Sequence, residues 1–122
     1  MNITVSQRPH ASVVQMQGRF LGSLHGDAFR GTLDELKRQD RRNVVVDLSR
    51  VDFMDSSAIG ALIGGLTTMR REGGDIRLAG LERRTRDLFL MTRLLGNVFA
   101  DYPTPEEADR SYAAEAPVRP AS

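Results

Sequence analysis

The chain has 122 residues, a formal net charge of +1 and no cysteine. This length is typical of one domain, and the lack of cysteine excludes disulfide bonds, thiol catalysis and cysteine-ligated metals. Two isolated histidines are too few to indicate a metal site, and a charge near zero gives no overall field that would attract nucleic acid or an anionic membrane.

The N-terminal third of the chain predicts a hairpin followed by a helix. Two short β-like runs, 3–6 and 12–17, flank a turn around Pro9. Gly18 is expected to end the second strand, and an irregular, glycine-containing connection follows. An amphipathic helix is then expected at 27–39, because apolar residues recur there with helical spacing.

The centre of the chain predicts two strand–helix–strand units. The β-branched run 44–46 is typical of a strand buried on both faces. A short loop, anchored by Val51 and Phe53, leads from this strand into a helix at 58–71. Another strand follows at 75–79, and strands joined in this way must pair in parallel.

The C-terminal third predicts a third helix at 82–95, with an apolar stripe that includes Met91. A short strand at 97–100 and a last helix reaching about residue 115 complete the domain. The segment 116–122 contains two prolines and is expected to be a disordered tail.

The order β-β-α-β-α-β-α-β-α predicts a mixed α/β fold. We expect one domain over 1–115, built on a mostly parallel sheet with helices packed against it and an antiparallel hairpin at the N-terminus. The first residues lack the apolar core of a signal peptide. The longest apolar stretch, 58–66, is far shorter than the ~20 residues of a membrane span. We therefore expect a cytoplasmic protein without membrane insertion.

Asp55, Ser56 and Ser57 stand between the valine strand and the helix at 58–71. A helix N-terminus exposes unpaired backbone N–H groups and the positive end of the helix dipole. A phosphate on Ser57 would be stabilised there, next to the carboxylate of Asp55. Asp and Ser are also preferred N-cap residues, so from spacing alone helix capping without further function is the favoured interpretation.

Three other functions are weakly supported by the sequence. A serine hydrolase needs a base near its serine, but there is no G-x-S-x-G motif and neither His10 nor His25 follows a strand as such a base would. Gly60 and Gly64 fall inside a helix, as a small-residue stripe, and no phosphate-binding loop motif exists. The arginines between 70 and 93 lack interleaved aromatics, which favours a solvated face over an RNA platform. We expect no catalytic residue, cofactor, metal or nucleic-acid partner.

Residues 44–62 have the sequence V-V-V-D-L-S-R-V-D-F-M-D-S-S-A-I-G-A-L. This resembles D-L-x-x-V-x-F-[ML]-D-S-S-G-[LI]-G, the signature of the STAS domain family of bacterial anti-sigma-factor antagonists. R-D-L-F-L-M-T-R-L-L-G-N-V-F at 86–99 is similar to the family's third-helix segment R-x-L-F-x-x-T-G-L-x-x-x-F, and Y-P-T-P-E-E-A to its C-terminal helix start. The resemblance covers most of 44–108 and implies the STAS fold.

The resemblance implies a regulator in a partner-switching pathway. Family members bind an anti-sigma factor that is also a serine kinase, and so release the sigma factor. The kinase phosphorylates the second serine of D-S-S, which abolishes binding, and a metal-dependent serine phosphatase of the PP2C type restores it. ATP and Mg²⁺ belong to these partners. We therefore expect phosphorylation at Ser57 and a partner surface formed by the exposed side of 58–71 together with Asp55, Ser56, Ser57, Ala58 and Leu21.

This chain departs from the family pattern at two positions. Ala58 stands where the family usually has glycine, and alanine stiffens the first turn of a helix. Leu21 stands where the family often has an aspartate near the phosphorylated serine, so it changes the charge of the partner face.

A second hypothesis is a non-switching STAS scaffold or an accessory subunit of a stress-signalling or transporter complex. Stable association with a partner regardless of ATP would distinguish it from the switch. The apolar, glycine-containing helix at 58–71 also leaves a homodimer open.

Overall fold

The computed structural model describes residues 1–115, so the tail expected at 116–122 lies outside the described residues. None of the described helices is both long enough and apolar enough to cross a membrane. The elements follow the expected order: β1 (Asn2–Gln7), β2 (Ser12–Phe20), α1 (Gly22–Arg38), β3 (Asn43–Met54), α2 (Ser56–Arg71), β4 (Asp75–Ala79), α3 (Arg83–Met91), β5 (Asp101–Tyr102) and α4 (Pro105–Glu115).

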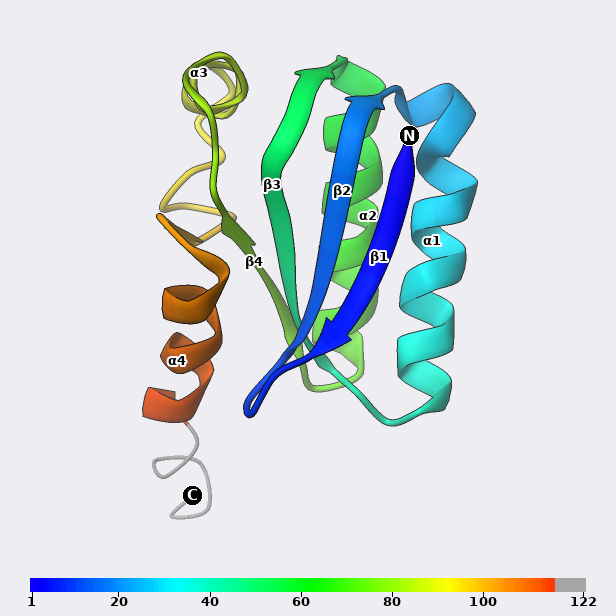
Figure 1. Ribbon diagram of the computed structural model, residues 1–122, viewed down its shortest axis with the longest axis vertical. Helices are drawn as coiled ribbons and strands as arrows, with labels where there is room; N and C mark the ends of the chain where they lie inside the picture. Colours follow the sequence, from blue (N-terminus) through cyan, green and yellow to red (C-terminus); the bar gives the residue numbers. More distant parts are fainter. Residues whose placement is uncertain (116–122) are drawn as a thin grey trace.

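The strands of the described residues form one sheet in the order β1-β2-β3-β4-β5. Figure 1 labels the first four of them. β1 pairs antiparallel with β2, whereas the other neighbours pair in parallel. The expected mixed sheet with an N-terminal antiparallel hairpin is therefore confirmed. Because β2 and β3 are parallel and each leads directly into a helix, α1 and α2 begin at the same end of the sheet, the upper end in Figure 1.

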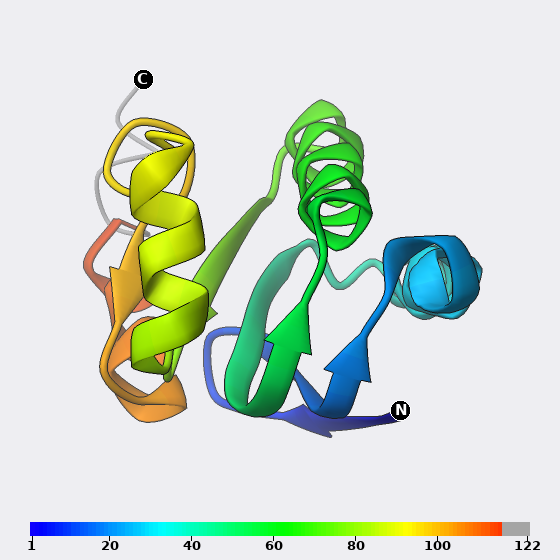
Figure 2. The ribbon, with the colours of Figure 1, turned by 90° about the horizontal axis from the view of Figure 1, so that it is seen from above.

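The central strand β3 is buried on both faces, as its valine run predicts. Val44 and Val46 belong to the larger core, together with buried residues of α1 and α2. Val45 belongs to a second core with Ala108 and Tyr112 of α4. Figure 2 shows this arrangement from above, with α1 and α2 on one face of the sheet and α4 on the other.

Helix α4 is held against the sheet by Tyr112 and Arg77. The Tyr112 hydroxyl donates a hydrogen bond to the Val44 carbonyl at 2.8 Å. The Arg77 guanidinium lies 4.0 Å from the centre of the Tyr112 ring and donates to the Ser111 hydroxyl at 2.6 Å. Arg77 is only 8% exposed. The expectation that the arginines between 70 and 93 form a solvated face is therefore wrong for Arg77.

The junction between β2 and α1 differs from the expectation. Gly18 does not end β2, which continues to Phe20. Gly18 instead adopts φ +101° at a shift in register against β3, as glycine does at a β-bulge. Phe20 is fully buried, and its ring lies 5.9 Å from that of Phe29 in α1. α1 begins at Gly22, so the expected irregular connection before 27 is helical instead.

β3 is longer than its valine run because it continues through the segment that we expected to be a loop. Val51 is buried, as an anchor should be, but Phe53 is 44% exposed and does not anchor the segment in the core. Phe53 is paired with Arg19 of β2, whose guanidinium lies 5.0 Å from the centre of the phenyl ring. The outward ring is thus covered by a cation–π contact with the neighbouring strand.

The third helix is shorter than predicted, and its predicted apolar stripe is confirmed only in part: Leu88 and Leu95 pack against the core, but Met91 does not. Met91 is 82% exposed, whereas Phe89 is fully buried. Arg93 adopts φ +57° just beyond the helix, a conformation that favours glycine, which the similar family motif has at this point. The last strand is Asp101–Tyr102 rather than 97–100, because pairing with β4 begins only at Asp101.

Candidate functional site

Asp55 connects β3 to α2 and caps the helix. Its backbone is extended, and its carboxylate oxygen Oδ1 accepts a hydrogen bond from the Ala58 N–H at 2.8 Å. One of the three polar residues at this point was expected to be the cap, and the structure identifies Asp55.

Ser57 lies in the first turn of α2 with an exposed side chain. Its hydroxyl donates to the same Oδ1 atom of Asp55 at 2.9 Å. Helix capping therefore accounts for Asp55 and does not account for Ser57. Ser56 is also exposed, and its hydroxyl forms no hydrogen bond within residues 1–115. Of the two serines, only Ser57 has a hydroxyl oriented by a carboxylate.

A third donor reaches Asp55 from the other helix. The backbone N–H of Gly22, the first residue of α1, donates to Oδ1 at 3.0 Å. A Cβ atom on Gly22 would lie 2.2 Å from the carbonyl carbon of Ser57 and 2.3 Å from its oxygen. These distances are far shorter than any normal contact, so the approach of α1 to the start of α2 requires glycine.

The structure places the other two expected site residues as follows. Leu21 is the half-buried N-cap residue of α1, and its N–H donates to Nδ1 of His25 at 3.0 Å. It lies at the site because its neighbour Gly22 contacts Ser57. The side chain of Ala58 is 0% exposed. The expectation that Ala58 itself forms part of the partner surface is therefore wrong for this conformation, and Ala58 contributes its N–H to the cap instead.

Sequence reasoning missed Gly22. The bond between Gly22 and Asp55 joins residues 33 apart, and the helix was expected to begin only at 27. Neither residue spacing nor helix propensity reports on such a contact. The available signal was Leu21, the immediate neighbour of Gly22, which the family resemblance placed near Ser57.

The pKa of the Asp55 carboxyl is lowered from its ordinary value. The largest cause is the hydrogen bond from the Gly22 N–H. Partial desolvation opposes this effect, while the bonds from the Ala58 N–H and the Ser57 hydroxyl add to it. Donors that bind the charged form favour ionisation. Asp55 is therefore a carboxylate at neutral pH and an acceptor for all three donors.

We expect Asp55 to make folding stability depend on pH under acidic conditions. Because its pKa is lower in the folded state, its contribution is fully present above the unfolded pKa of about 3.9 and is lost as pH falls through the folded value. A ¹³C NMR titration of the carboxyl should give a pKa below that of an unfolded peptide. The destabilisation caused by Asp55→Ala should shrink over the same acidic range. A folded-state pKa at or above the peptide value would contradict this.

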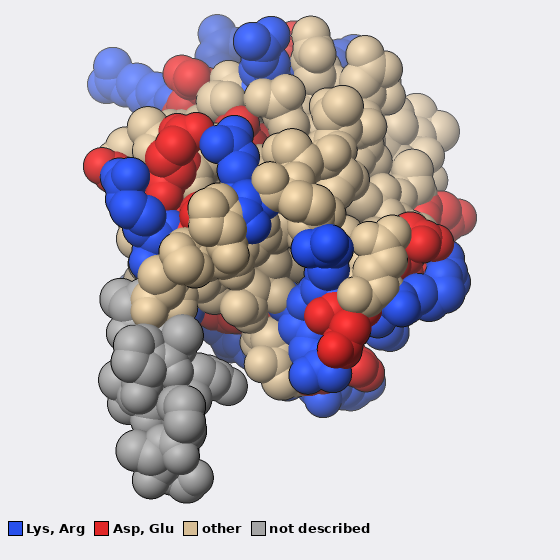
Figure 3. All heavy atoms as spheres, turned by 60° about the horizontal axis from the view of Figure 1, so that its bottom comes forward, with Lys and Arg blue, Asp and Glu red and all other residues tan. Residues whose placement is uncertain are grey.

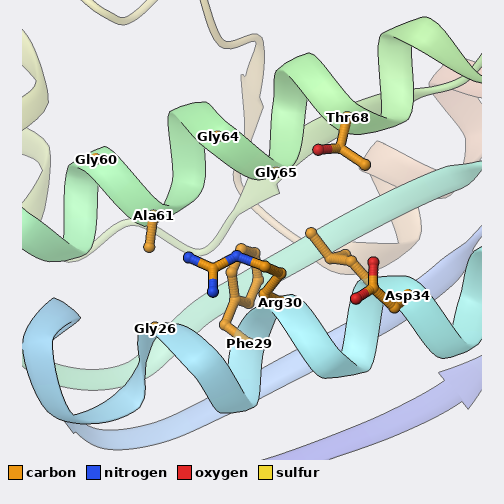
Figure 4. A pocket seen from close by; sticks show the side chains of 10 residues that line it. Gly26, Phe29, Arg30, Asp34, Gly60, Ala61, Gly64, Gly65 and Thr68 are labelled. Atoms are coloured by element: carbon orange, nitrogen blue, oxygen red, sulfur yellow. The ribbon is translucent and has the colours of Figure 1, made fainter.

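A groove between α1 and α2 begins about one turn beyond Ser57 (Figure 4). It encloses about 230 Å³, and Arg30 and Asp34 of α1 lie along it. Gly60 and Gly64 of α2 are exposed to it, and a Cβ atom on either would meet nothing within 4 Å. The part of α2 that lines this groove next to Ser57 therefore carries two positions without a side chain.

Charged side chains of both signs lie beside one another on the face around the lower end of the molecule. Figure 3 shows groups of Lys and Arg next to groups of Asp and Glu there, beside a broad area without charged side chains. Within the expected arginine face, Arg70 pairs with Asp75 at 3.1 Å, and Arg86 pairs with Asp101. This mixture fits a solvated surface better than a nucleic-acid platform, which would need one dominant sign.

Comparison with known proteins finds one matching family model and a curated relative of known function. The family model described as "Mlab, STAS domain" matches residues 3–98. Among curated proteins, the anti-sigma F factor antagonist of Paenibacillus polymyxa is 27% identical over 97 residues, which cover 77% of this chain and 82% of the relative.

Three solved structures with the same fold are each less than 25% identical to this chain. An anti-sigma factor antagonist from Mycobacterium paratuberculosis has a TM-score of 0.79 and 22% identity, with 92% of this chain and 93% of that chain covered. The Bacillus cell fate determinant SpoIIAA in its phosphorylated form has a TM-score of 0.68 and 20% identity, with 90% of this chain and 99% of that chain covered. A sulfate transporter family protein from Wolinella succinogenes has a TM-score of 0.76 and 14% identity, with 90% of each chain covered. Antagonists and a transporter-family protein thus share the fold, so the fold alone does not assign the function.

Proposed function

The chain belongs to the STAS domain family, and we propose that it is an anti-sigma-factor antagonist whose binding to its partner is controlled by phosphorylation of Ser57. The observation that carries this proposal is the position of the Ser57 hydroxyl, which is exposed at the N-terminus of α2 and hydrogen-bonded to the ionised Asp55. The similarity to the curated Paenibacillus polymyxa antagonist supports the same function.

The geometry suits Ser57 as an acceptor of a phosphoryl group. A kinase partner would bring ATP and Mg²⁺. Oγ of Ser57 would form a bond to the γ-phosphorus as the bond to ADP breaks, and the hydroxyl proton would pass to a base of the kinase. Asp55 orients the hydroxyl through the 2.9 Å hydrogen bond, so that an oxygen lone pair faces outward. The product phosphate would lie at the start of α2, where the helix dipole and free N–H groups favour an anion.

Phosphorylation at this point would change the docking surface rather than the fold. It adds a charge of about −1.5 to −2 next to Asp55. A partner that approaches the exposed start of α2 with acidic groups would then meet two adjacent anionic groups. Like charges brought together in an interface oppose binding strongly. In this mechanism the anti-sigma factor is a serine kinase that ends its own interaction, and a PP2C-type phosphatase restores it.

The test is mass spectrometry on the protein purified from its own host, with and without phosphatase treatment. We expect a phosphatase-sensitive increase of about 80 Da, one phosphoryl group, mapped to Ser57. Ser56→Ala should keep the modification and Ser57→Ala should lose it. The co-purifying partner should leave the wild-type protein when ATP and Mg²⁺ are added, and stay on Ser57→Ala. A stable partner that ignores ATP, with Ser57 unmodified, would instead support the scaffold or transporter-subunit hypothesis.

A further inference from the structure

We infer that Gly22 is a positioning residue for Ser57: through its close approach and its N–H bond to Asp55, it holds the serine hydroxyl in place for phosphorylation. This inference rests on the proposed function for its kinetic consequence, whereas its structural part can be tested without any partner. It adds Gly22, the first residue of α1 and the neighbour of Leu21, to the residues that hold Ser57.

The first step is the arrangement of donors around one oxygen atom. Oδ1 of Asp55 accepts the Ala58 N–H at 2.8 Å, the Ser57 hydroxyl at 2.9 Å and the Gly22 N–H at 3.0 Å. Two of these donors belong to α2 and move with Ser57. The Gly22 N–H is the one that comes from α1, so it ties the carboxylate, and with it the serine hydroxyl, to the rest of the molecule.

The second step is the exclusion of any side chain at Gly22. A Cβ atom there would meet the carbonyl carbon of Ser57 at 2.2 Å, its oxygen at 2.3 Å and the Ala58 nitrogen at 2.5 Å. These are backbone atoms, so no rotamer change can relieve the clash. An alanine would have to move the start of α1 away from Ser57 by at least 1.2 Å to bring the 2.2 Å distance to the 3.4 Å of an ordinary contact.

The third step is the effect of that movement on phosphoryl transfer. A displacement of this size stretches or breaks the Gly22–Asp55 bond and frees the carboxylate to rotate. The Ser57 hydroxyl then loses its fixed direction. Misplacement of a reacting group by about 1 Å can cost a hundredfold in rate. For Gly22→Ala we expect a 10- to 100-fold slower phosphorylation of Ser57.

Gly26→Ala is the matched control. Gly26 lies one turn further along α1, and a Cβ atom there would meet the Cβ atom of Ala61 at 3.8 Å, an ordinary contact. Both substitutions exchange glycine for alanine in the same helix and on the side that faces α2. Gly22 is the first residue of α1 and Gly26 lies in its interior, so a change in helix propensity alone would affect Gly26→Ala more than Gly22→Ala. A larger effect of Gly22→Ala reports the contact with Ser57 rather than the stiffness of the helix.

The experiment has two arms. In the first, a ¹³C NMR titration compares the Asp55 carboxyl in wild type, Gly22→Ala and Gly26→Ala. Loss of the Gly22 hydrogen bond should raise the pKa of Asp55 in Gly22→Ala alone, because that bond is the largest cause of its lowering. In the second, each protein is incubated in desalted extract of its own host with ATP and Mg²⁺, and phosphorylation of Ser57 is followed by intact mass.

A double-mutant cycle tests the route through Asp55. If Gly22 acts by holding that carboxylate, Gly22→Ala combined with Asp55→Ala should slow phosphorylation no more than Asp55→Ala alone. Additive effects would overturn the inference. Asp55→Ala also serves when Gly22→Ala does not fold: phosphorylation of Asp55→Ala at the wild-type rate would then exclude any positioning through this carboxylate.

Failure of the inference and failure of the proposed function give different results. If Gly22→Ala matches Gly26→Ala both in the pKa of Asp55 and in phosphorylation rate, Gly22 has no positioning role although Ser57 is a phosphorylation site. If wild type is not phosphorylated under any condition, the proposed function fails. The NMR arm then still decides whether Gly22 holds Asp55.

Discussion

Ser57→Asp is expected to weaken binding to the anti-sigma factor about 100-fold or more. The substitution places a second carboxylate beside Asp55 on the exposed start of α2. Juxtaposed like charges at an interface cost several kcal/mol, and each ~1.4 kcal/mol changes the dissociation constant tenfold. The measurement is titration calorimetry with the partner that co-purifies with the native protein.

Two variants separate the position of the charge from its mere presence. Ser57→Ala should bind like the unphosphorylated protein and should be insensitive to ATP. Ser56→Asp adds the same charge one residue earlier, away from the hydroxyl that Asp55 orients, and should weaken binding less. The fold of Ser57→Asp should be intact, because an acidic residue in the first turn of a helix interacts favourably with the helix dipole. Equal binding by Ser57→Asp and wild type would rule out a charge switch at this serine.

Tyr112→Ala is expected to reduce the free energy of unfolding by about 3–5 kcal/mol, the range for removing a large buried aromatic side chain. Tyr112 is 5% exposed and fills the second core, between α4 and the sheet. Its ring also lies against the guanidinium of Arg77. Because native domains are stable by only about 5–15 kcal/mol, this single change should lower the urea midpoint markedly, as measured by circular dichroism.

Tyr112→Phe separates the hydroxyl from the ring. Burial raises the pKa of the Tyr112 hydroxyl far above its ordinary range, so the group stays protonated and donates to the Val44 carbonyl. Loss of this bond alone should cost about 1 kcal/mol. Met91→Ala, at a side chain that is 82% exposed, should change stability by less than about 0.5 kcal/mol. If Tyr112→Phe cost as much as Tyr112→Ala, packing would not be the main contribution of this residue.

The two predictions concern opposite faces of the sheet and should be independent. Tyr112 closes the core under α4, whereas Ser57 lies where α1 and α2 begin. β3 connects them, since its valine run supplies both cores and its last residues lead into Asp55. A stability variant at Tyr112 should therefore leave partner affinity unchanged in the fraction of molecules that remains folded.

Local patterns in the sequence were sufficient for the order of elements, the mixed sheet and the location of Asp55 and Ser57. The β-branched run 44–46 predicted a strand buried on both faces, because only such residues suit a strand that is covered twice. The strand at 75–79 was predicted with its observed bounds. These features depend on residues close together in the chain, whose spacing and propensities carry the information.

Contacts between distant residues decided what local patterns could not show. Pairing with β2 extends β3 through the expected loop and turns Phe53 outward against Arg19. The docking of α4 buries Arg77, although the sequence predicted a solvated face for the arginines between 70 and 93.

At the site itself, the sequence determined that a carboxylate and two serines stand at the start of a helix. Local spacing limited the cap to one of these three residues, and the Asp55–Ala58 bond identifies it. Only the tertiary structure decided that Ala58 is buried and that Gly22 of α1 meets the backbone of Ser57. The physical reason is that caps and helix starts depend on near neighbours in the chain. The distance between two helices depends instead on the size of the residues at their contact. The hydrophobic periodicity of either helix does not indicate which of its residues will lie at that contact.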